Sequence, residues 1–427
     1  MTRLHEGLAA LGEPEFRKLF LGQAISVVGV MFTVVALPFA VLEIGGSATD
    51  IGIVEAAYII PLTVFVLFGG VWADRLPRQK VMLAADFGRT ALQLAAAALL
   101  VSGVAQVWQL ALVQVGIGFC EAFFRPSYTG LVPEVVSGPR LQQANALQGL
   151  VMSGAITLGA SVAGLLVAAV GPGWAIGIDG LTYLVSAWFL WRLRPDAFRG
   201  LSAPADREVA TPGGRDFVRD LVAGWREFTS HTWLWAMVAG ASVFLFAVEG
   251  PIQVLGPIVA QDVYDGARTW GLTSAAMGIG QIAGGLLSLR WRPRRPLFVI
   301  AAGMGVAALP VAFLALQVPV GMLYASLASL GVVWGLYDPF WTTCMQREVA
   351  PEMISRVSSY DYLGSLAFFP AGLALAGPLA GAFGVSAVLW GGSVAALAVA
   401  LALVCVRDVR APHAMGPADQ SAAPPGV

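Results

Sequence analysis

Charge is what this sequence most lacks. Only 12% of its 427 residues are charged and 57% are hydrophobic, whereas a soluble domain carries about 25% charged residues. A soluble fold of this composition would expose several apolar faces to water and would aggregate. The 50 glycines and 25 prolines follow no fixed period, which excludes a collagen-like chain. The composition therefore favours a protein whose solvent is the lipid bilayer.

Three further absences exclude whole classes of function. Neither the three cysteines nor the three histidines show the spacing of a disulfide framework, a metal site or a catalytic triad. No Gly-x-x-x-x-Gly-Lys-Ser/Thr loop is present, so ATP is not the direct energy source. A net charge of −1 offers no general attraction to nucleic acid. We expect no enzyme, no cofactor, no metal and no nucleic-acid partner.

Long apolar runs are abundant. A helix needs about 20 residues to cross roughly 30 Å of hydrocarbon, and twelve runs approach or exceed this length. They cover residues 17–42, 51–72, 80–102, 107–126, 143–170, 174–193, 233–260, 269–290, 296–316, 319–341, 357–382 and 385–406. The first run is too long for the apolar part of a signal peptide, so we expect it to remain as the first span.

One long polar connection divides the chain. It runs over 194–230, between the sixth and seventh spans, and its part at 216–229 has apolar residues at helical spacing. We expect a first six-helix bundle at 1–193, a cytoplasmic linker with an amphipathic helix on the membrane surface, and a second bundle at 231–406. The remaining 407–427 is predicted to be a disordered cytoplasmic tail.

Basic residues predict the orientation of the chain. Of the 25 lysines and arginines, all but Arg89 and Arg268 lie in or beside segments that share one side if there are twelve spans. Basic loops face the cytoplasm. We therefore expect a multi-pass protein of the plasma membrane with both termini in the cytoplasm. We also expect it to be a monomer.

The two halves show traces of a repeat at an offset of about 213 residues. At this offset Pro126, Gly159, Gly164 and Gly171 correspond to Pro339, Gly372, Gly377 and Gly384. Together with the six-plus-six pattern, these matches predict an all-α membrane protein of two pseudo-symmetric six-helix bundles. Such duplications serve alternating access, in which two halves rock about a central site.

A motif between the second and third spans resembles the signature of the major facilitator superfamily. It is filled by Gly70, Asp74, Arg75, Arg78 and Lys80. The resemblance implies the fold of that family and a role for these residues as a latch between the two bundles. The equivalent loop of the second half, 284–292, lacks the acid, so the latch would be one-sided.

Other segments narrow the resemblance to one branch. The segments Phe16–Phe20, Ala85–Arg89, Phe124–Ala146 and Gly177–Leu184 are similar to drug and siderophore exporters, above all to the macrolide-efflux and enterobactin-exporter type. This implies proton-coupled export. The sequence departs from many proton-coupled exporters at Leu112, where they have Arg, and after Gly159, where their Pro is absent.

Glu249 is the foremost candidate for the coupling site. It lies near mid-depth of the seventh span, where a charge is costly and its presence indicates a specific role. Gly250 and Pro251 follow it and interrupt regular helix hydrogen bonding. A protonatable carboxyl beside a loosened backbone suits a proton or a cationic substrate, and the alternative is a neutral carboxyl held for packing.

Four other charged residues pair along their own helices. Asp86 and Arg89, at positions i and i+3, are expected to form a structural ion pair. Glu121 and Arg125, at i and i+4, are placed near the cytoplasmic end of the fourth span. We expect them either to form a cytoplasmic gate, with Asp338 of the tenth span or with Asp74 and Arg78 of the latch motif, or to be a static pair at a helix end.

Aromatic residues predict both an interfacial belt and an apolar cavity. Trp108, Trp174 and Trp233 lie at span ends, as belt residues do. Trp334 and Tyr337 are among those inside spans, where they would suit a hydrophobic organic molecule, including a cationic one.

The sequence thus predicts a proton-driven exporter of a hydrophobic small molecule such as a drug, antibiotic or siderophore-like metabolite. Two alternatives stay open at this point. One is an importer or uniporter of a sugar or metabolite, and the other is a non-transporting membrane sensor on a transporter scaffold.

Overall fold

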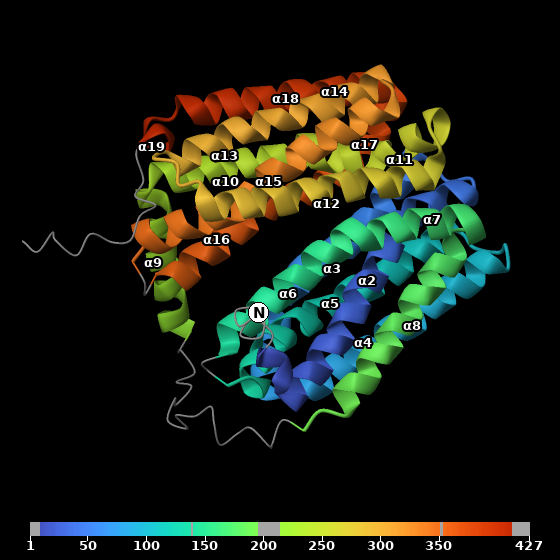
Figure 1. The fold of residues 1–427 in the computed structure, drawn as a ribbon, viewed down its shortest axis with the longest axis horizontal. Helices are drawn as coiled ribbons and strands as arrows, with labels where there is room; N and C mark the ends of the chain where they lie inside the picture. Colours follow the sequence, from blue (N-terminus) through green and yellow to red (C-terminus); the bar gives the residue numbers. More distant parts are fainter. Residues whose placement is uncertain (1–8, 138–139, 195–213, 351–352, 412–427) are drawn as a thin grey trace, which may run out of the picture. The chain divides into compact units, whose positions relative to one another are not determined.

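A computed structural model describes residues 9–137, 140–194, 214–350 and 353–411 (Figure 1). These residues form helices joined by short connections, and none of them is in a strand. Within these described ranges, twelve helical segments are long and apolar enough to cross a membrane, which confirms the predicted number of spans. The predicted disordered tail beyond residue 411 and the first part of the predicted linker, 195–213, lie outside the described residues.

The first half of the chain consists of six spans and a short helical turn, η1, which precedes them. Their bounds are η1 (Ala9–Gly12), α2 (Pro14–Glu43), α3 (Ala48–Arg75), α4 (Arg78–Val101), α5 (Val107–Val135), α6 (Leu141–Gly154), η3 (Ala155–Gly159), α7 (Ala160–Val170) and α8 (Pro172–Trp191). The segments α6, η3 and α7 together make the fifth span, with a π-helical turn at η3.

The second six spans follow helix α9 (Gly214–Ser230). Their bounds are α10 (Thr232–Phe244), η5 (Leu245–Glu249), α11 (Gly250–Val263), α12 (Gly266–Arg290), α13 (Pro296–Met304), η6 (Gly305–Ala307), α14 (Ala308–Leu316), α15 (Val320–Glu348), α16 (Ile354–Leu366), α17 (Phe369–Phe383) and α18 (Val385–Cys405), before the short α19 (Arg407–Arg410). Three of these spans are composite: α10–η5–α11, α13–η6–α14 and α16–α17.

The predicted ends of two spans were wrong. The fourth span was expected to end at residue 126, but α5 continues to Val135. The tenth was expected to end at residue 341, but α15 continues to Glu348, and both helices contain a proline, Pro126 and Pro339. Pro removes one hydrogen bond from a helix interior, and spanning helices tolerate this because neighbouring groups satisfy the freed carbonyl. Arg125 therefore lies inside a helix rather than beside a basic loop.

The chain forms two compact units. Unit 1 contains the first six spans together with Gln253–Ala275 and Leu373–Ala382, and unit 2 contains the remainder. In unit 1, α3 packs along α5, α4 packs against α5 and α8, and α2 packs against α7 and α8. In unit 2, α18 packs against α13 and α14, and α10 packs against α16 and α18. The bundle limits predicted at 193 and 231 stay a prediction.

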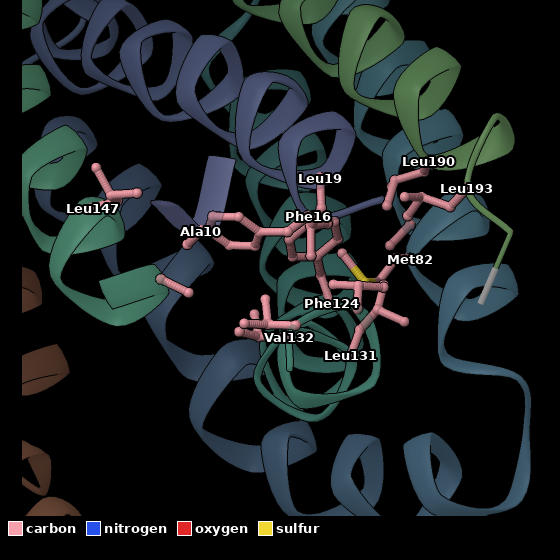
Figure 2. Packing of buried hydrophobic residues seen from close by; sticks show 14 residues of the cluster. Ala10, Phe16, Leu19, Met82, Phe124, Leu131, Val132, Leu147, Leu190 and Leu193 are labelled. Carbon is pink, nitrogen blue, oxygen red and sulfur yellow. The ribbon is translucent and has the colours of Figure 1, made fainter. Parts of the chain in front are cut away.

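One end of unit 1 is held by a cluster of apolar side chains (Figure 2). Phe16 and Leu19 of α2 meet Met82 of α4, Leu131 of α5 and Leu190 of α8, and all five are buried. In lipid such a cluster contributes through close van der Waals packing more than through escape from water. It fixes the ends of four helices beside the basic segments of this unit.

Glycines at corresponding positions of the two halves make the same kind of close contact between helices. A Cβ on Gly118 of α5 would lie 2.2 Å from a carbonyl oxygen of α3, and one on Gly331 of α15 would lie 2.0 Å from a carbonyl oxygen of α12. The two glycines are 213 positions apart. At the same offset, Gly171 and Gly384 both have φ of +88° where one span ends and the next begins. The two six-helix bundles are thus pseudo-symmetric.

Helix α9 covers the range predicted for the amphipathic helix. Its Trp225 and Phe228 contact Tyr360 of α16, with ring centroids 5.5 and 5.9 Å apart. These two rings therefore pack on protein, whereas the predicted contact of this helix with the membrane surface stays a prediction.

Candidate transport site

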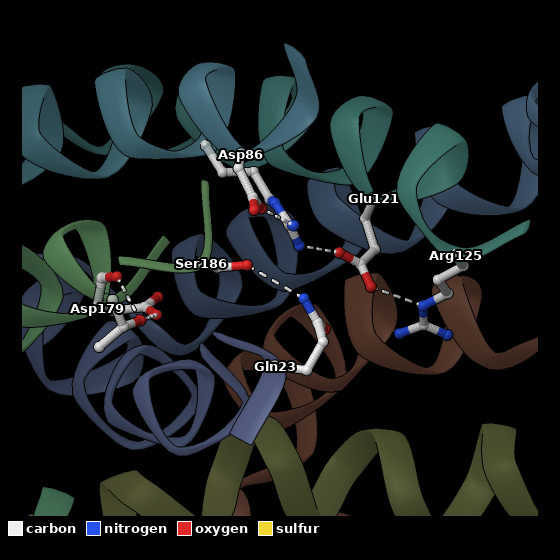
Figure 3. Close-up of polar contacts among 8 residues, drawn as sticks. Gln23, Asp86, Glu121, Arg125, Asp179 and Ser186 are labelled. Atoms are coloured by element: carbon white, nitrogen blue, oxygen red, sulfur yellow. Dashed lines mark hydrogen bonds and ion pairs between the residues drawn. The ribbon is translucent and has the colours of Figure 1, made fainter. Parts of the chain in front are cut away.

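A buried ionic network joins α4 and α5 at mid-depth (Figure 3). Glu121 is the central residue of the 29-residue α5, so its predicted place near a helix end was wrong. Arg89 of α4 donates to Glu121 Oε2 at 2.6 Å and also pairs with Asp86. Arg125 Nε donates to Glu121 Oε1 at 2.8 Å. The structure thus joins two pairs that the sequence predicted separately.

The network balances its own charge. Asp86 and Glu121 are matched by Arg89 and Arg125, as burial at this depth requires. The Arg89 side chain is only 3% exposed, and its guanidinium lies 4.0 Å from the centroid of the Phe124 ring. Such a cation–π contact adds to the ion pairs. Two carboxylates and the Phe124 ring thereby bind Arg89, although its buried Nε has no hydrogen-bond partner among the described residues. Sequence spacing could not reveal its contact with α5.

Arg125 forms the accessible end of the network. Its side chain is 49% exposed, whereas that of Glu121 is 16% exposed. A guanidinium in the middle of a spanning helix faces water or protein rather than lipid. The network therefore leads from the buried Asp86 to an exposed side chain at the surface of unit 1. Asp338 belongs to unit 2, so its predicted gate with Arg125 stays a prediction.

Glu249 ends the π-helical turn η5. It lies near the middle of the 32-residue span Thr232–Val263 and is partly buried. The ring of Pro251 would clash with the backbone of a regular helix one turn earlier, and the wider π turn relieves this conflict. The predicted irregularity of the helix at this position is confirmed, and π turns of this kind are frequent at functional sites.

An aromatic face of α15 accompanies the acids of unit 2. Trp334, Tyr337 and Trp341 follow one another at helical spacing, with ring centroids 5.4 and 6.0 Å apart. The indole of Trp341 donates to Asp361 Oδ2 of α16 at 2.9 Å, and Asp338 is exposed on the same helix. The sequence left Trp341 and Asp361 out of the site, because their contact joins two helices.

The charges inside the spans of unit 2 are negative. Glu249, Asp338 and Asp361 lie away from the helix ends, whereas each Lys or Arg of the described spanning helices of unit 2 lies in a first or last turn. A cavity bordered by any of these carboxylates would attract cations and protons. Among the described residues no group of three or more His, Cys, Asp or Glu is arranged to hold a metal ion.

A second buried carboxyl, Asp179 of α8, has only neutral donors. It is fully buried and accepts hydrogen bonds from Thr33 of α2 at 2.6 Å and from Gln93 of α4 at 2.7 Å. Gly29 makes room for it, since a Cβ there would lie 2.8 Å from Asp179 Oδ1. These bonds tie α2, α4 and α8 of unit 1 together, and Figure 3 includes Asp179.

The structure describes the side chains of only part of the latch motif. Gly70, Asp74 and Arg75 lie in the last turns of α3, where the side chains lie outside the description. Arg78 donates to the carbonyl of Gly130 at 2.9 Å and to Glu134 at 2.6 Å, both on α5, and Lys80 is exposed. Arg78 therefore binds within unit 1, and the latch between the bundles stays a prediction.

The exposure of two tryptophans agrees with the predicted aromatic belt, and the burial of the third contradicts it. Trp108 and Trp174 are exposed at helix starts. Trp233 is 4% exposed, because it packs edge-on against Trp341 with centroids 5.6 Å apart.

Known proteins resemble this chain over most of its length. It is 31% identical over 373 residues to the multidrug efflux pump Tap of Mycolicibacterium fortuitum, covering 83% of this chain and 86% of that protein. It is 25% identical over 409 residues to macrolide efflux protein A of Streptococcus pyogenes, covering 93% and 96%.

Solved structures share the fold. A bacterial homologue of the human lysosomal transporter Spinster, in an inward-facing and unoccupied conformation, matches with a TM-score of 0.68 at 18% identity over 91% of this chain and 94% of that one. The nucleoside transporter NupG matches with a TM-score of 0.67 at 14% identity over 91% and 98%. The family profile described as Major Facilitator Superfamily matches residues 19–366. This chain therefore belongs to the Major Facilitator Superfamily and is a multi-pass membrane transporter, not an enzyme.

Proposed function

We propose that this transporter exports a hydrophobic small molecule, cations included, in exchange for protons. Its relatives named for multidrug and macrolide efflux support the direction of transport. The cycle is one of alternating access by a monomer in the plasma membrane, with both termini in the cytoplasm. A drug, an antibiotic or a siderophore-like metabolite fits this substrate class.

Glu249 carries the proposal of proton coupling. It is a partly buried acid on a π-helical turn in the middle of a span. In the proposed cycle it takes a proton from outside and releases it inside. One charge moving through 100 mV supplies about 2.3 kcal/mol, and each pH unit adds about 1.4 kcal/mol. This energy is available to drive substrate outward.

The preference for cations rests on the charges of unit 2. Glu249, Asp338 and Asp361 are negative, and aromatic rings of α15 line up beside the two aspartates. A lipophilic cation would gain both charge pairing and cation–π contact on such a surface. Because protons and cationic substrate would compete for the same carboxyls, binding of one favours release of the other.

The remaining site residues are assigned positioning roles. Asp86 and Arg89 anchor Glu121, which holds Arg125 within unit 1. In another conformation Arg125 turns to Asp338 and closes the path between the substrate site and the cytoplasm. The latch, made of Gly70, Asp74, Arg75, Arg78 and Lys80, stabilises one conformation of the two bundles.

The test is Glu249→Gln in inverted vesicles, with ethidium as a lipophilic cation and an imposed pH gradient. Gradient-driven uptake into the vesicles should fall to background, while the thermal unfolding temperature stays unchanged. The matched control is Glu55→Gln, a partly buried acid on α3 that has no part in the proposal. Wild-type uptake in Glu249→Gln would reject the assignment.

Two results would favour other functions. Counterflow of a sugar or metabolite in vesicles of known orientation, without response to the pH gradient, would indicate an importer or uniporter. Absence of any substrate-induced proton flux or counterflow would indicate a non-transporting sensor.

A further inference from the structure

A pocket of about 510 Å³ lies at the end of unit 1 where α2 begins and α8 ends. Its walls include Glu15 and Lys18 of α2 and Trp188, Arg192 and Arg194 at the end of α8. Pockets for small ligands typically measure about 300–1,000 Å³. This one is far from Glu249 in the chain and plays no part in the proposed cycle.

The walls of the pocket have an excess of positive charge. Glu15 is buried and already occupied, since it accepts from Lys18 Nζ at 2.6 Å and from the backbone N–H of Arg194 at 2.8 Å. Lys18 also donates to the carbonyl of Arg192 at 3.2 Å. The guanidinium groups of Arg192 and Arg194 are exposed, and neither is in an ion pair with any described residue. Two arginines are thus available to an anion.

Two exposed tryptophans place the pocket at the membrane interface. Trp188 is 47% and Trp191 is 71% exposed, and they are one helical turn apart. The guanidinium of Arg192 lies 4.9 Å from the Trp188 ring centroid. Exposed tryptophans at the end of a spanning helix lie at the level of lipid headgroups. A molecule with its anionic group in this pocket would therefore have its apolar part in the acyl region of the membrane, along the two indoles.

We propose that this pocket binds the phosphodiester headgroup of an anionic membrane phospholipid, such as phosphatidylglycerol. Arg192 and Arg194 would hold the phosphate, because guanidinium groups match its oxygens in geometry and charge. Basic pockets at the ends of spanning helices recognise anionic headgroups in this way. A zwitterionic lipid brings its own cation, which the two arginines repel. The tryptophans flank the glycerol backbone.

The experiment compares lipids retained by the full-length protein. Purified protein from vesicles of equal phosphatidylglycerol and phosphatidylcholine is examined by native mass spectrometry. We expect phosphatidylglycerol to be retained preferentially. In the double variant Arg192→Gln, Arg194→Gln its affinity should fall about 30-fold, as two lost basic contacts predict.

The matched control is Arg292→Gln, Arg294→Gln, which removes two exposed arginines at the same spacing between α12 and α13. It should retain the lipid as the wild type does. Excess inorganic phosphate should displace little lipid, because phosphate has no glycerol backbone to contact the indoles. Equal retention of both lipids, an equal loss in the control, or full displacement by phosphate would each overturn the proposal. Unchanged thermal unfolding of both variants excludes misfolding as the cause.

Discussion

Arg89 is held by two carboxylates and an aromatic ring, with almost no contact with water. In Arg89→Met the side chain keeps its length but Asp86 and Glu121 lose their cation. Breaking a buried pair in this way costs about 3–5 kcal/mol. We expect a clear fall in the thermal unfolding temperature of the purified protein, and a smaller one for Arg89→Lys. Equal stability of Arg89→Met and wild type would contradict the network.

At the same scale, sequence spacing identified some partners and missed others. The i to i+3 and i to i+4 rules found the contacts of Arg89 with Asp86 and of Arg125 with Glu121. They could not find Arg89 with Glu121, because this pair depends on how α4 packs against α5. Trp341 with Asp361 was missed for the same reason.

Close packing between α12 and α15 depends on particular glycines. A Cβ on Gly284 would lie 2.2 Å from the carbonyl oxygen of Val332, whereas one on the adjacent Gly285 would meet nothing within 4 Å. Gly284→Ala must push the two helices apart, at a cost of about 1–3 kcal/mol. Gly285→Ala should be neutral or slightly stabilising, because Ala favours helix. Thermal unfolding of both variants in detergent measures the difference, and equal values would contradict this contact.

Hydropathy predicted the elements better than it predicted their ends. Twelve spans follow from apolar length alone, since each span must be about as long as the bilayer is thick. The ends of α5 and α15 were missed because the polar residues beyond positions 126 and 341 resemble loops in composition. Neighbouring helices, not local sequence, keep those turns helical.

At the scale of the whole molecule, repeat-equivalent positions carry opposite charge. Arg125 on α5 and Asp338 on α15 are 213 positions apart, and both are exposed inside their helices. In transporters built from repeats, equivalent faces of the two bundles border one central cavity. The predicted gate therefore joins two residues that the duplication itself placed in equivalent positions.

A double-mutant cycle tests this gate through transport of ethidium. If Arg125 and Asp338 pair during the cycle, Asp338→Asn should slow transport more in the wild-type background than after Arg125→Gln, where only its attraction for the cation is lost. Residues that interact typically show coupling of about 0.5–3 kcal/mol, which is roughly 2-fold to 150-fold in rate. Asp361→Asn is the matched control, because Asp361 is bound by Trp341 within unit 2 and should combine additively with Arg125→Gln. Additive effects in both cycles would show that the two charges act separately, and Arg125 would then serve only to hold Glu121.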